Sequence, residues 1–180
     1  MSSPFPEFFA LFGIAPRFAI DSQDLSRAYR EVLAQVHPDR HAAAGAAERR
    51  AAMQLASHAN EAYEVLRSDS ARAAYLCRQQ GVAVDGAGAP PIPPAFLQRQ
   101  MDWRERLEQA RDGATLAALA TEVERQRAQL RALLAQQIDE LRDFPAAAAS
   151  VRALLFIEKM DAEIARVTAE REDAARPPGT

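Results

Sequence analysis

His37, Pro38 and Asp39 are the residues in this sequence whose types and spacing are best suited to a functional site. Pro38 fixes the backbone and offers no amide N–H, so a helix that reaches His37 must end there. The imidazole and the carboxylate are then presented as a rigid pair on an exposed corner. Because a rigid pair loses little entropy when it docks, this arrangement predicts contact with a partner protein.

Two other interpretations of this segment remain open from the residues alone. In the first, the tripeptide only ends a helix and Asp39 caps the next turn. In the second, His37, Asp39 and His41 bind a metal ion, although a loop interrupted by proline offers no common ligand face and no fourth ligand is evident. The sequence also lacks a Gly-rich phosphate loop, a nucleophile elbow and a zinc-binding helix. We therefore expect no catalytic residue, no bound metal and no cofactor.

An arginine-bearing helix is predicted to precede this segment, over about residues 21–37. Its apolar stripe, at helical spacing, consists of Leu25, Tyr29, Val32 and Val36. Arg27 and Arg30 fall on the opposite, solvent-facing side of the helix, and Arg40 follows the loop. These three cations indicate contact with an acidic patch on a protein partner.

The sequence as a whole predicts an all-α protein. Apolar residues make up 48% of the chain, only seven residues are Gly, and good helix formers dominate. The expected helices cover about residues 7–12, 21–37, 46–66, 69–80, 95–111, 114–141 and 145–172. The apolar positions that define the third helix are Met53, Ala56, Tyr63 and Leu66, and those of the sixth are Leu116, Leu119, Val123, Leu130, Leu133 and Leu141. Short turns between the last three helices indicate an antiparallel bundle.

Residues 85–94 mark a break between two domains. Gly86 and Gly88, followed by four prolines, cannot continue a helix. The proline-rich part is expected to be stiff and extended. We accordingly expect one domain over residues 1–84, a Gly/Pro-rich linker over 85–94, a three-helix bundle over 95–175 and a disordered tail over 176–180.

Composition excludes several classes of protein. Cys77 is the only cysteine, so the chain can form no internal disulfide and no cysteine-based zinc site. A formal net charge of −3 does not suit a nucleic-acid-binding domain. No apolar run is long enough to span a bilayer, and residues 1–13 lack the features of a signal peptide. These features predict a cytoplasmic monomer that binds neither nucleic acid nor membrane.

Several segments resemble those of a known family. Residues 7–80 resemble a J domain, in which a short helix precedes a helix ending in His-Pro-Asp, a long antiparallel helix and a short fourth one. More narrowly, residues 7–170 resemble the HscB family of iron–sulfur co-chaperones. The segments that carry the resemblance are Phe8-Phe9-Ala10-Leu11-Phe12-Gly13-Ile14, His37-Pro38-Asp39-Arg40, Asn60-Glu61-Ala62-Tyr63-Glu64-Val65-Leu66, Arg72-Ala73-Ala74-Tyr75-Leu76 and Phe96-Leu97-Gln98-Arg99-Gln100-Met101-Asp102-Trp103-Arg104-Glu105. The last segment is the one that narrows the resemblance from J domains in general to HscB.

This resemblance implies an adaptor and not an enzyme. The J domain would engage a dedicated DnaK-class ATPase (HscA-like), with His37-Pro38-Asp39 stimulating ATP hydrolysis and Arg27, Arg30 and Arg40 as docking contacts. The C-terminal bundle would hold the iron–sulfur scaffold protein (IscU-like) and present it to the ATPase. An alternative is a J protein for a general DnaK-type chaperone, whose bundle binds other clients or dimerises. The lack of a cysteine-rich N-terminal extension favours a bacterial-type member.

A second partner site is predicted on the helix over about residues 95–111. On a helical wheel, Leu97 and Met101 lie about 100° and 140° from Phe96, whereas Trp103 shares the buried face of Phe96. Glu105 and Glu108 lie close to Leu97 and Met101, and exposed apolar side chains among carboxylates are typical of a binding surface. In the alternative interpretation, the core-facing side of this helix is wide, and Leu97 and Met101 are buried in the bundle. The resemblance favours binding and implies a scaffold site made of Leu97, Met101, Asp102, Glu105, Glu108 and Phe156.

Two positions depart from the family pattern. Ala59 stands where a larger aliphatic residue is usual, and Gln98 stands where Met is frequent. The first change is expected to weaken packing and not function. The second is expected to soften affinity for the scaffold.

Overall fold

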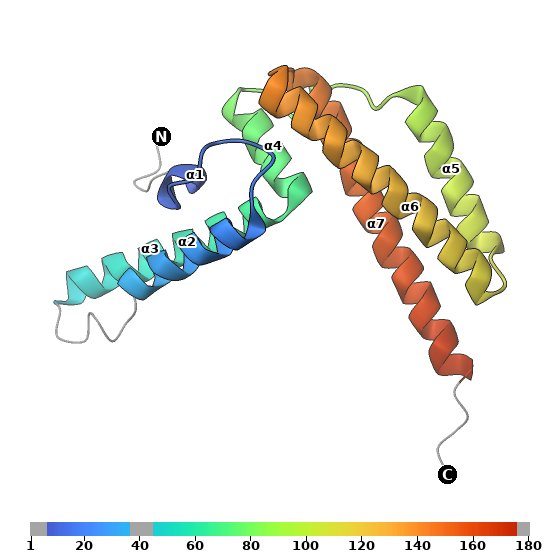
Figure 1. The fold of residues 1–180 in the computed structure, drawn as a ribbon, viewed down its shortest axis with the longest axis horizontal. Helices are drawn as coiled ribbons and strands as arrows, with labels where there is room; N and C mark the ends of the chain where they lie inside the picture. Colours follow the sequence, from blue (N-terminus) through green and yellow to red (C-terminus); the bar gives the residue numbers. More distant parts are fainter. Residues whose placement is uncertain (1–6, 37–44, 176–180) are drawn as a thin grey trace, which may run out of the picture.

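The computed structural model describes residues 7–36 and 45–175, and all regular structure in these two ranges is helical. The N-terminal half contains α1 (Phe8–Leu11), α2 (Ser22–Gln35), α3 (Ala46–Arg67) and α4 (Asp69–Gln79). The C-terminal half contains α5 (Pro94–Gln109), α6 (Gly113–Ala135), the π-helical turn η2 (Gln136–Glu140) and α7 (Phe144–Ala175). The two halves lie next to each other in an elongated, bent molecule (Figure 1). The predicted all-α class is confirmed.

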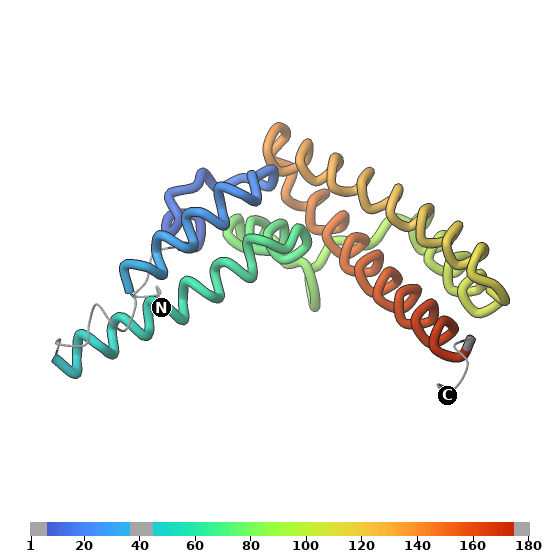
Figure 2. The backbone as a smooth tube through the Cα atoms, turned by 60° about the horizontal axis from the view of Figure 1, so that its bottom comes forward, coloured from blue at the N-terminus to red at the C-terminus, as the bar shows by residue number. Residues whose placement is uncertain are grey.

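The helices α2 and α3 form an antiparallel hairpin, in which they lie side by side in Figures 1 and 2. Asp21 begins α2 by accepting hydrogen bonds from two backbone N–H groups of the first turn. The stripe predicted for α2 faces inward, with Leu25 and Val36 buried. Tyr29 of this stripe stacks on Tyr63 of α3, with 4.2 Å between the ring centroids. The short helix α1 packs against α3 and completes this core.

The helices α6 and α7 are the long antiparallel pair of the C-terminal bundle, and α5 lies along α6 (Figure 1). Asp112 and Asp143 precede α6 and α7 and accept hydrogen bonds from backbone N–H groups of their first turns. Pro94 begins α5, a favourable place for a residue without an amide hydrogen. The largest fully buried side chains of the bundle are Trp103, Leu116, Leu119, Val123, Leu134, Ile138, Val151, Leu154, Ile157 and Met160.

Two apolar positions used to predict the sixth helix do not belong to the core. Leu133 and Leu141 are 40% and 63% exposed, whereas Leu134 and Ile138 are fully buried. A spacing of seven residues does not match the 3.6 residues per turn of a helix, so the predicted stripe drifts away from the buried one. The π-helical turn η2 follows, so Leu141, which comes after it, does not keep the spacing of a regular α-helix.

The inward face of α3 also differs from the prediction at one position. Met53 is 61% exposed, whereas its neighbour Ala52 is buried. Met53 lies about 140° around the helix from Leu66, which is fully buried. Ala59 is fully buried on the side of Leu66, so its small size directly affects the packing of α3.

Leu134→Ala is expected to lower the free energy of unfolding by about 2–4 kcal/mol, because the substitution leaves a cavity in the bundle core. The matched control is Leu133→Ala, at the neighbouring exposed position, which is expected to change this free energy by less than about 1 kcal/mol. Urea denaturation followed by circular dichroism measures both values. Equal losses for the two variants would contradict the burial of Leu134.

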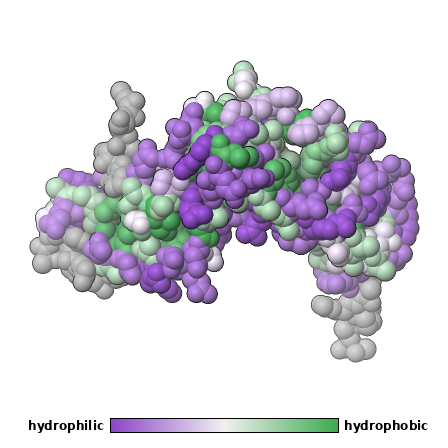
Figure 3. All heavy atoms as spheres, turned by 45° about the horizontal axis from the view of Figure 1, so that its top comes forward, coloured by the Kyte–Doolittle hydropathy of each residue, from purple (hydrophilic) through white to green (hydrophobic). Residues whose placement is uncertain are grey.

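The two halves meet where α4 packs against α7. The buried hydroxyl of Ser70 donates a hydrogen bond of 2.8 Å to Glu158 of α7. Cys77 of α4 is also buried, and burial raises the pKa of its thiol to about 11, so the thiol stays neutral. On the face drawn in Figure 3, hydrophobic residues gather near the middle of the molecule as well as within the N-terminal half. The N-terminal half is therefore docked on the bundle through α4.

Residues 80–93 connect α4 to α5 without a helix. Gly86 and Gly88 have φ angles of +70° and +90°, a backbone conformation that glycine adopts readily. Arg152 of α7 holds the segment by donating a hydrogen bond of 2.7 Å to the carbonyl oxygen of Pro90. We propose that the domain boundary lies in this segment, although Pro94, the last residue of the predicted linker, already belongs to α5.

Candidate functional site

The predicted stimulating loop, His37-Pro38-Asp39 with Arg40, lies outside the described residues. The structure places the two helix ends that flank it. The helix α2 ends at Gln35 and α3 begins at Ala46, both at the end of the hairpin that is far from the bundle (Figures 1 and 2). The role of the loop itself stays a prediction.

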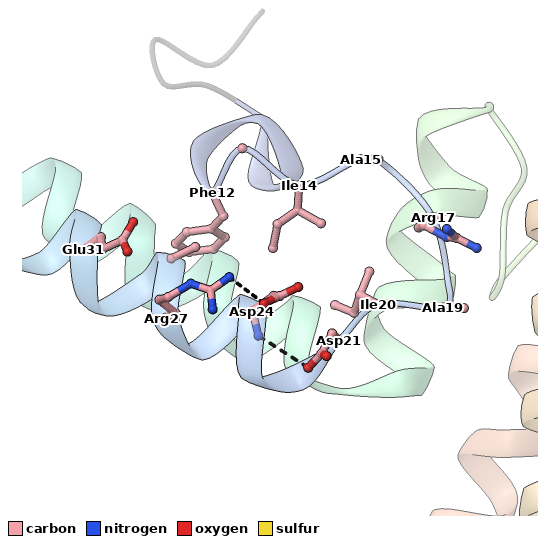
Figure 4. A pocket seen from close by; sticks show the side chains of 12 residues that line it. Phe12, Ile14, Ala15, Arg17, Ala19, Ile20, Asp21, Asp24, Arg27 and Glu31 are labelled. Atoms are coloured by element: carbon pink, nitrogen blue, oxygen red, sulfur yellow. Dashed lines mark hydrogen bonds and ion pairs between the residues drawn. The ribbon is translucent and has the colours of Figure 1, made fainter.

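Arg27 and Arg30 are exposed on α2, on the side expected from the helical wheel. Arg27 donates a hydrogen bond of 2.6 Å to Asp24, and Figure 4 shows this ion pair beside a surface pocket. The pocket has a volume of about 440 Å³ and lies between α2 and the loop that precedes it. Asp24 offsets part of the charge of Arg27, so Arg27 offers less attraction to an acidic partner than an unpaired cation would.

The second predicted site lies at the surface of α5. Leu97 is 45% exposed and Met101 is 69% exposed, so the alternative in which the core absorbs both side chains is wrong. Trp103 is fully buried, as its helical-wheel angle predicted. Glu105 and Glu108 are exposed on the same helix. We call Leu97, Met101, Glu105 and Glu108 the α5 face, an apolar surface bordered by carboxylates.

Phe156 of α7 is half-buried beside α5. Its ring lies edge-on to Phe96, with 6.0 Å between centroids, and stacks on Trp103 with 6.5 Å between centroids. Arg104 covers the ring of Phe156, with its guanidinium carbon 5.7 Å from the centroid. These contacts join α5 to α7 and so hold the helix that carries the α5 face.

A polar contact through Glu122 holds α5 against α6. The indole N–H of Trp103 donates a hydrogen bond of 3.0 Å to this carboxylate, and Arg106 donates another of 2.7 Å. These two hydrogen bonds hold the pKa of Glu122 below its ordinary value, and the same carboxylate raises the pKa of Arg106. Asp102 also accepts a hydrogen bond from Arg106, at 3.4 Å. This last hydrogen bond lies within α5, and Asp102 lies about 100° around the helix from Met101.

A groove between α5 and α7 includes one end of the α5 face. Its volume is about 390 Å³, and the residues that line it are Arg104, Leu107, Glu108, Glu163, Arg166 and Val167. Glu108 was predicted from the sequence as a site residue, whereas Glu163 and Arg166 were not. A helical wheel describes one helix at a time, so it carried no signal for residues of α7 that lie across from α5.

The described residues form no metal centre. Within residues 7–36 and 45–175, no three His, Cys, Asp or Glu side chains gather to hold a metal ion. The ligands considered from the sequence, His37, Asp39 and His41, lie outside those ranges. No helix in the described parts of the chain is both long and apolar enough to cross a membrane.

Two protein-family models match the chain. The model described as DnaJ domain matches residues 7–75, which hold α1 to α3 and most of α4. The model described as HSCB C-terminal oligomerisation domain matches residues 92–165, which hold α5, α6, η2 and most of α7. The two matches follow each other along the chain in the order of the two halves of the structure.

Similar proteins match nearly the whole chain. The co-chaperone protein HscB homolog of Bordetella avium is 49% identical over 162 residues, covering 89% of this chain and 96% of that relative. The homolog of Bordetella petrii is 48% identical over 174 residues, covering 96% of this chain and 98% of that relative.

Solved structures agree with these sequence matches. The chaperone HscB from Vibrio cholerae, 34% identical, superposes with a TM-score of 0.80 and covers 92% of this chain and 99% of its own. Human co-chaperone protein HscB, 20% identical, superposes with a TM-score of 0.85 over 92% of this chain and 84% of its own, which supports the fold alone. With both family models matched in order and close to half the residues identical to those of its relatives, the chain belongs to the HscB family of J-domain co-chaperones.

Proposed function

We propose that this chain is an adaptor in iron–sulfur cluster assembly. It stimulates the ATPase of a dedicated DnaK-class chaperone (HscA-like) and delivers the iron–sulfur scaffold protein (IscU-like) to it. The residues that act on the ATPase are His37, Pro38, Asp39, Arg27, Arg30 and Arg40. The residues that bind the scaffold are Leu97, Met101, Asp102, Glu105, Glu108 and Phe156. The protein works as a cytoplasmic monomer and needs no cofactor, metal ion, nucleic acid or membrane.

The observation that carries the scaffold half of the proposal is the exposure of Leu97 and Met101. A large apolar side chain that stays exposed to water contributes no burial energy to folding. Two such side chains on one helix face, bordered by carboxylates, form a surface suited to a partner. The aromatic contacts of Phe156 with Phe96 and Trp103 hold α5, the helix that carries this face, against α7. A preformed surface of this kind binds with little ordering cost.

The ATPase half of the proposal rests on the His-Pro-Asp sequence and on membership of the family. The ends of α2 and α3 that flank the loop lie far from α5 in Figure 1. Two partners can therefore bind one chain at the same time. By binding both partners, the chain raises the effective concentration of the scaffold at the chaperone, even before the scaffold and the chaperone touch each other.

ATP hydrolysis by the purified DnaK-class chaperone tests this function, measured with the full chain, with the scaffold, and with both. The chain alone is expected to stimulate hydrolysis, and both proteins together are expected to exceed the sum of the separate effects by about fivefold or more. No stimulation by the chain would contradict the ATPase half. Stimulation that the scaffold leaves unchanged, with no heat of scaffold binding to the chain, would assign the protein to a general chaperone and another client.

A further inference from the structure

The surface pocket between α2 and the loop that precedes it has an apolar lining. Its volume of about 440 Å³ lies in the range of sites that hold a small chemical group. The large apolar side chains that line it are Phe12, Ile14 and Ile20, and Figure 4 shows Ile14 and Ile20 pointing into the same space. Ile14 and Ile20 are only half-buried, so a side chain that entered the pocket would cover them further.

Hydrogen bonds hold both chain segments that border the pocket. After α1, the backbone N–H of Ile14 donates to a carbonyl oxygen of that helix at 3.0 Å, and Gly13 has the positive φ of +63° that suits such a turn. Before α2, the backbone N–H groups of Phe18 and Ala19 donate to the carboxylate of Asp139 in η2, at 2.7 Å and 2.9 Å. The pocket is therefore preformed, and filling it costs little ordering of the chain.

The rim of the pocket carries an excess of negative charge. Of the two arginines that line it, Arg27 is paired with Asp24, and Arg17 is paired with the same carboxylate of η2 that holds the loop. Asp21 and Glu31 are the other charged residues of the rim. Glu31 is exposed and forms no ion pair with any residue of the described ranges. Because both arginines already have a carboxylate partner, Asp21 and Glu31 leave the rim acidic.

We propose that this pocket receives a lysine or arginine side chain of the DnaK-class chaperone. Lys and Arg lay an aliphatic stem along apolar surface and keep the charged head in water, which matches an apolar lining below an acidic rim. A carboxylate from the partner would instead meet Asp21 and Glu31 with like charge. A purely apolar side chain would leave both carboxylates without a cation.

The place of the pocket on α2 indicates the chaperone as the source of this cation. Arg27 lines the pocket, and Arg30 lies about 60° from Arg27 around the helix. The proposed chaperone contacts are therefore continuous with the pocket, whereas α5 belongs to the other half of the molecule (Figure 1). Adjacent charges of opposite sign, Arg30 and Glu31, also define the orientation in which a partner docks. The choice of the chaperone rests on the function proposed above.

Substitutions at Glu31 and Ala28, which both line the pocket, test the proposal. Glu31→Lys reverses the charge of the rim, Glu31→Gln removes it, and Ala28→Leu reduces the space inside. The matched controls Glu61→Lys and Ala51→Leu make the same changes at exposed positions of α3, outside the pocket. Surface plasmon resonance measures binding of each full chain to the chaperone with ATP and, separately, to the scaffold, at several salt concentrations. Circular dichroism checks that each variant is folded.

We expect Glu31→Lys to weaken chaperone binding about tenfold and Glu31→Gln about threefold, mainly through slower association, with both effects shrinking as salt is added. Ala28→Leu is expected to weaken binding about fivefold at every salt concentration, and both controls should bind like the wild type. Wild-type affinity of Glu31→Lys for the chaperone would overturn the proposal, as would an equal loss in Glu61→Lys. Weaker binding of the scaffold alone would also overturn it, because the pocket would then have another occupant. If the wild-type chain binds the chaperone without stimulating its ATPase, the proposed function fails, and the affinities still decide whether the pocket takes a cation.

Discussion

The variant His37→Gln is expected to lose stimulation of the chaperone ATPase, by at least about tenfold at any concentration of the chain, because the interface loses one of its central contacts. Gln is polar and similar in length, but it has neither the ring of His nor its ability to carry a charge. Pro38, the residue predicted to stop the preceding helix, is unchanged, so the substitution alters one side chain only. Steady-state ATP hydrolysis by the purified chaperone measures the loss.

Scaffold binding by this variant is the internal control. The α5 face lies in the bundle, far from the ends of α2 and α3 that flank residue 37 (Figure 1). Isothermal titration calorimetry with the scaffold should therefore give the wild-type dissociation constant, and thermal unfolding should be unchanged. Wild-type stimulation by His37→Gln would refute the assignment of this loop to the ATPase.

The double variant Leu97→Ala, Met101→Ala is expected to weaken scaffold binding by about 100-fold, or roughly 3 kcal/mol, because it removes both large apolar side chains of the α5 face. Its free energy of unfolding should stay within about 1 kcal/mol of the wild type, since both side chains are exposed and Ala is a good helix former. Calorimetric titration and urea denaturation measure the two quantities on the same preparations.

Leu133→Ala, Leu155→Ala is the matched control for this pair. Leu133 and Leu155 are both 40% exposed, but they lie on α6 and α7 outside the α5 face. Removal of exposed apolar area alone would weaken binding equally in the two double variants. A large loss of stability in Leu97→Ala, Met101→Ala, or equal affinities of the two double variants, would show that the α5 face is not the scaffold site.

The sequence alone predicted the helices well because each of their signals is local. Asp21 and Gly81 mark helix ends through the hydrogen bonds and backbone angles that each residue type allows. The stripe of Leu25 and Val36 and the burial of Trp103 follow from helical periodicity, which operates within one helix. The prediction failed at Leu133 because a spacing of seven residues drifts away from the buried stripe of a helix with 3.6 residues per turn. It failed at Leu141 because a single regular helix was assumed where the chain makes a π turn.

Some residues of the candidate sites could be found from the sequence, and others could not. Leu97 and Met101 were found from their angles on one helix, and the structure decided that they are exposed rather than absorbed by a wide core. Glu163 and Arg166, which face α5 from α7, gave no signal in the sequence.

Tertiary structure alone decided how the J domain is held on the bundle. In the sequence, Asp139 is one acid among many on a helix surface, and Phe18 and Ala19 lie in a loop about 120 residues away. Their contact depends on the π turn and on the docking of α4 against α7, and neither has a local signature. By itself, the sequence determined the helices, the His-Pro-Asp motif and the composition of the α5 face, because short-range sterics and periodicity determine these. The relative placement of the two halves depends on contacts between distant residues, so only the folded chain could show it.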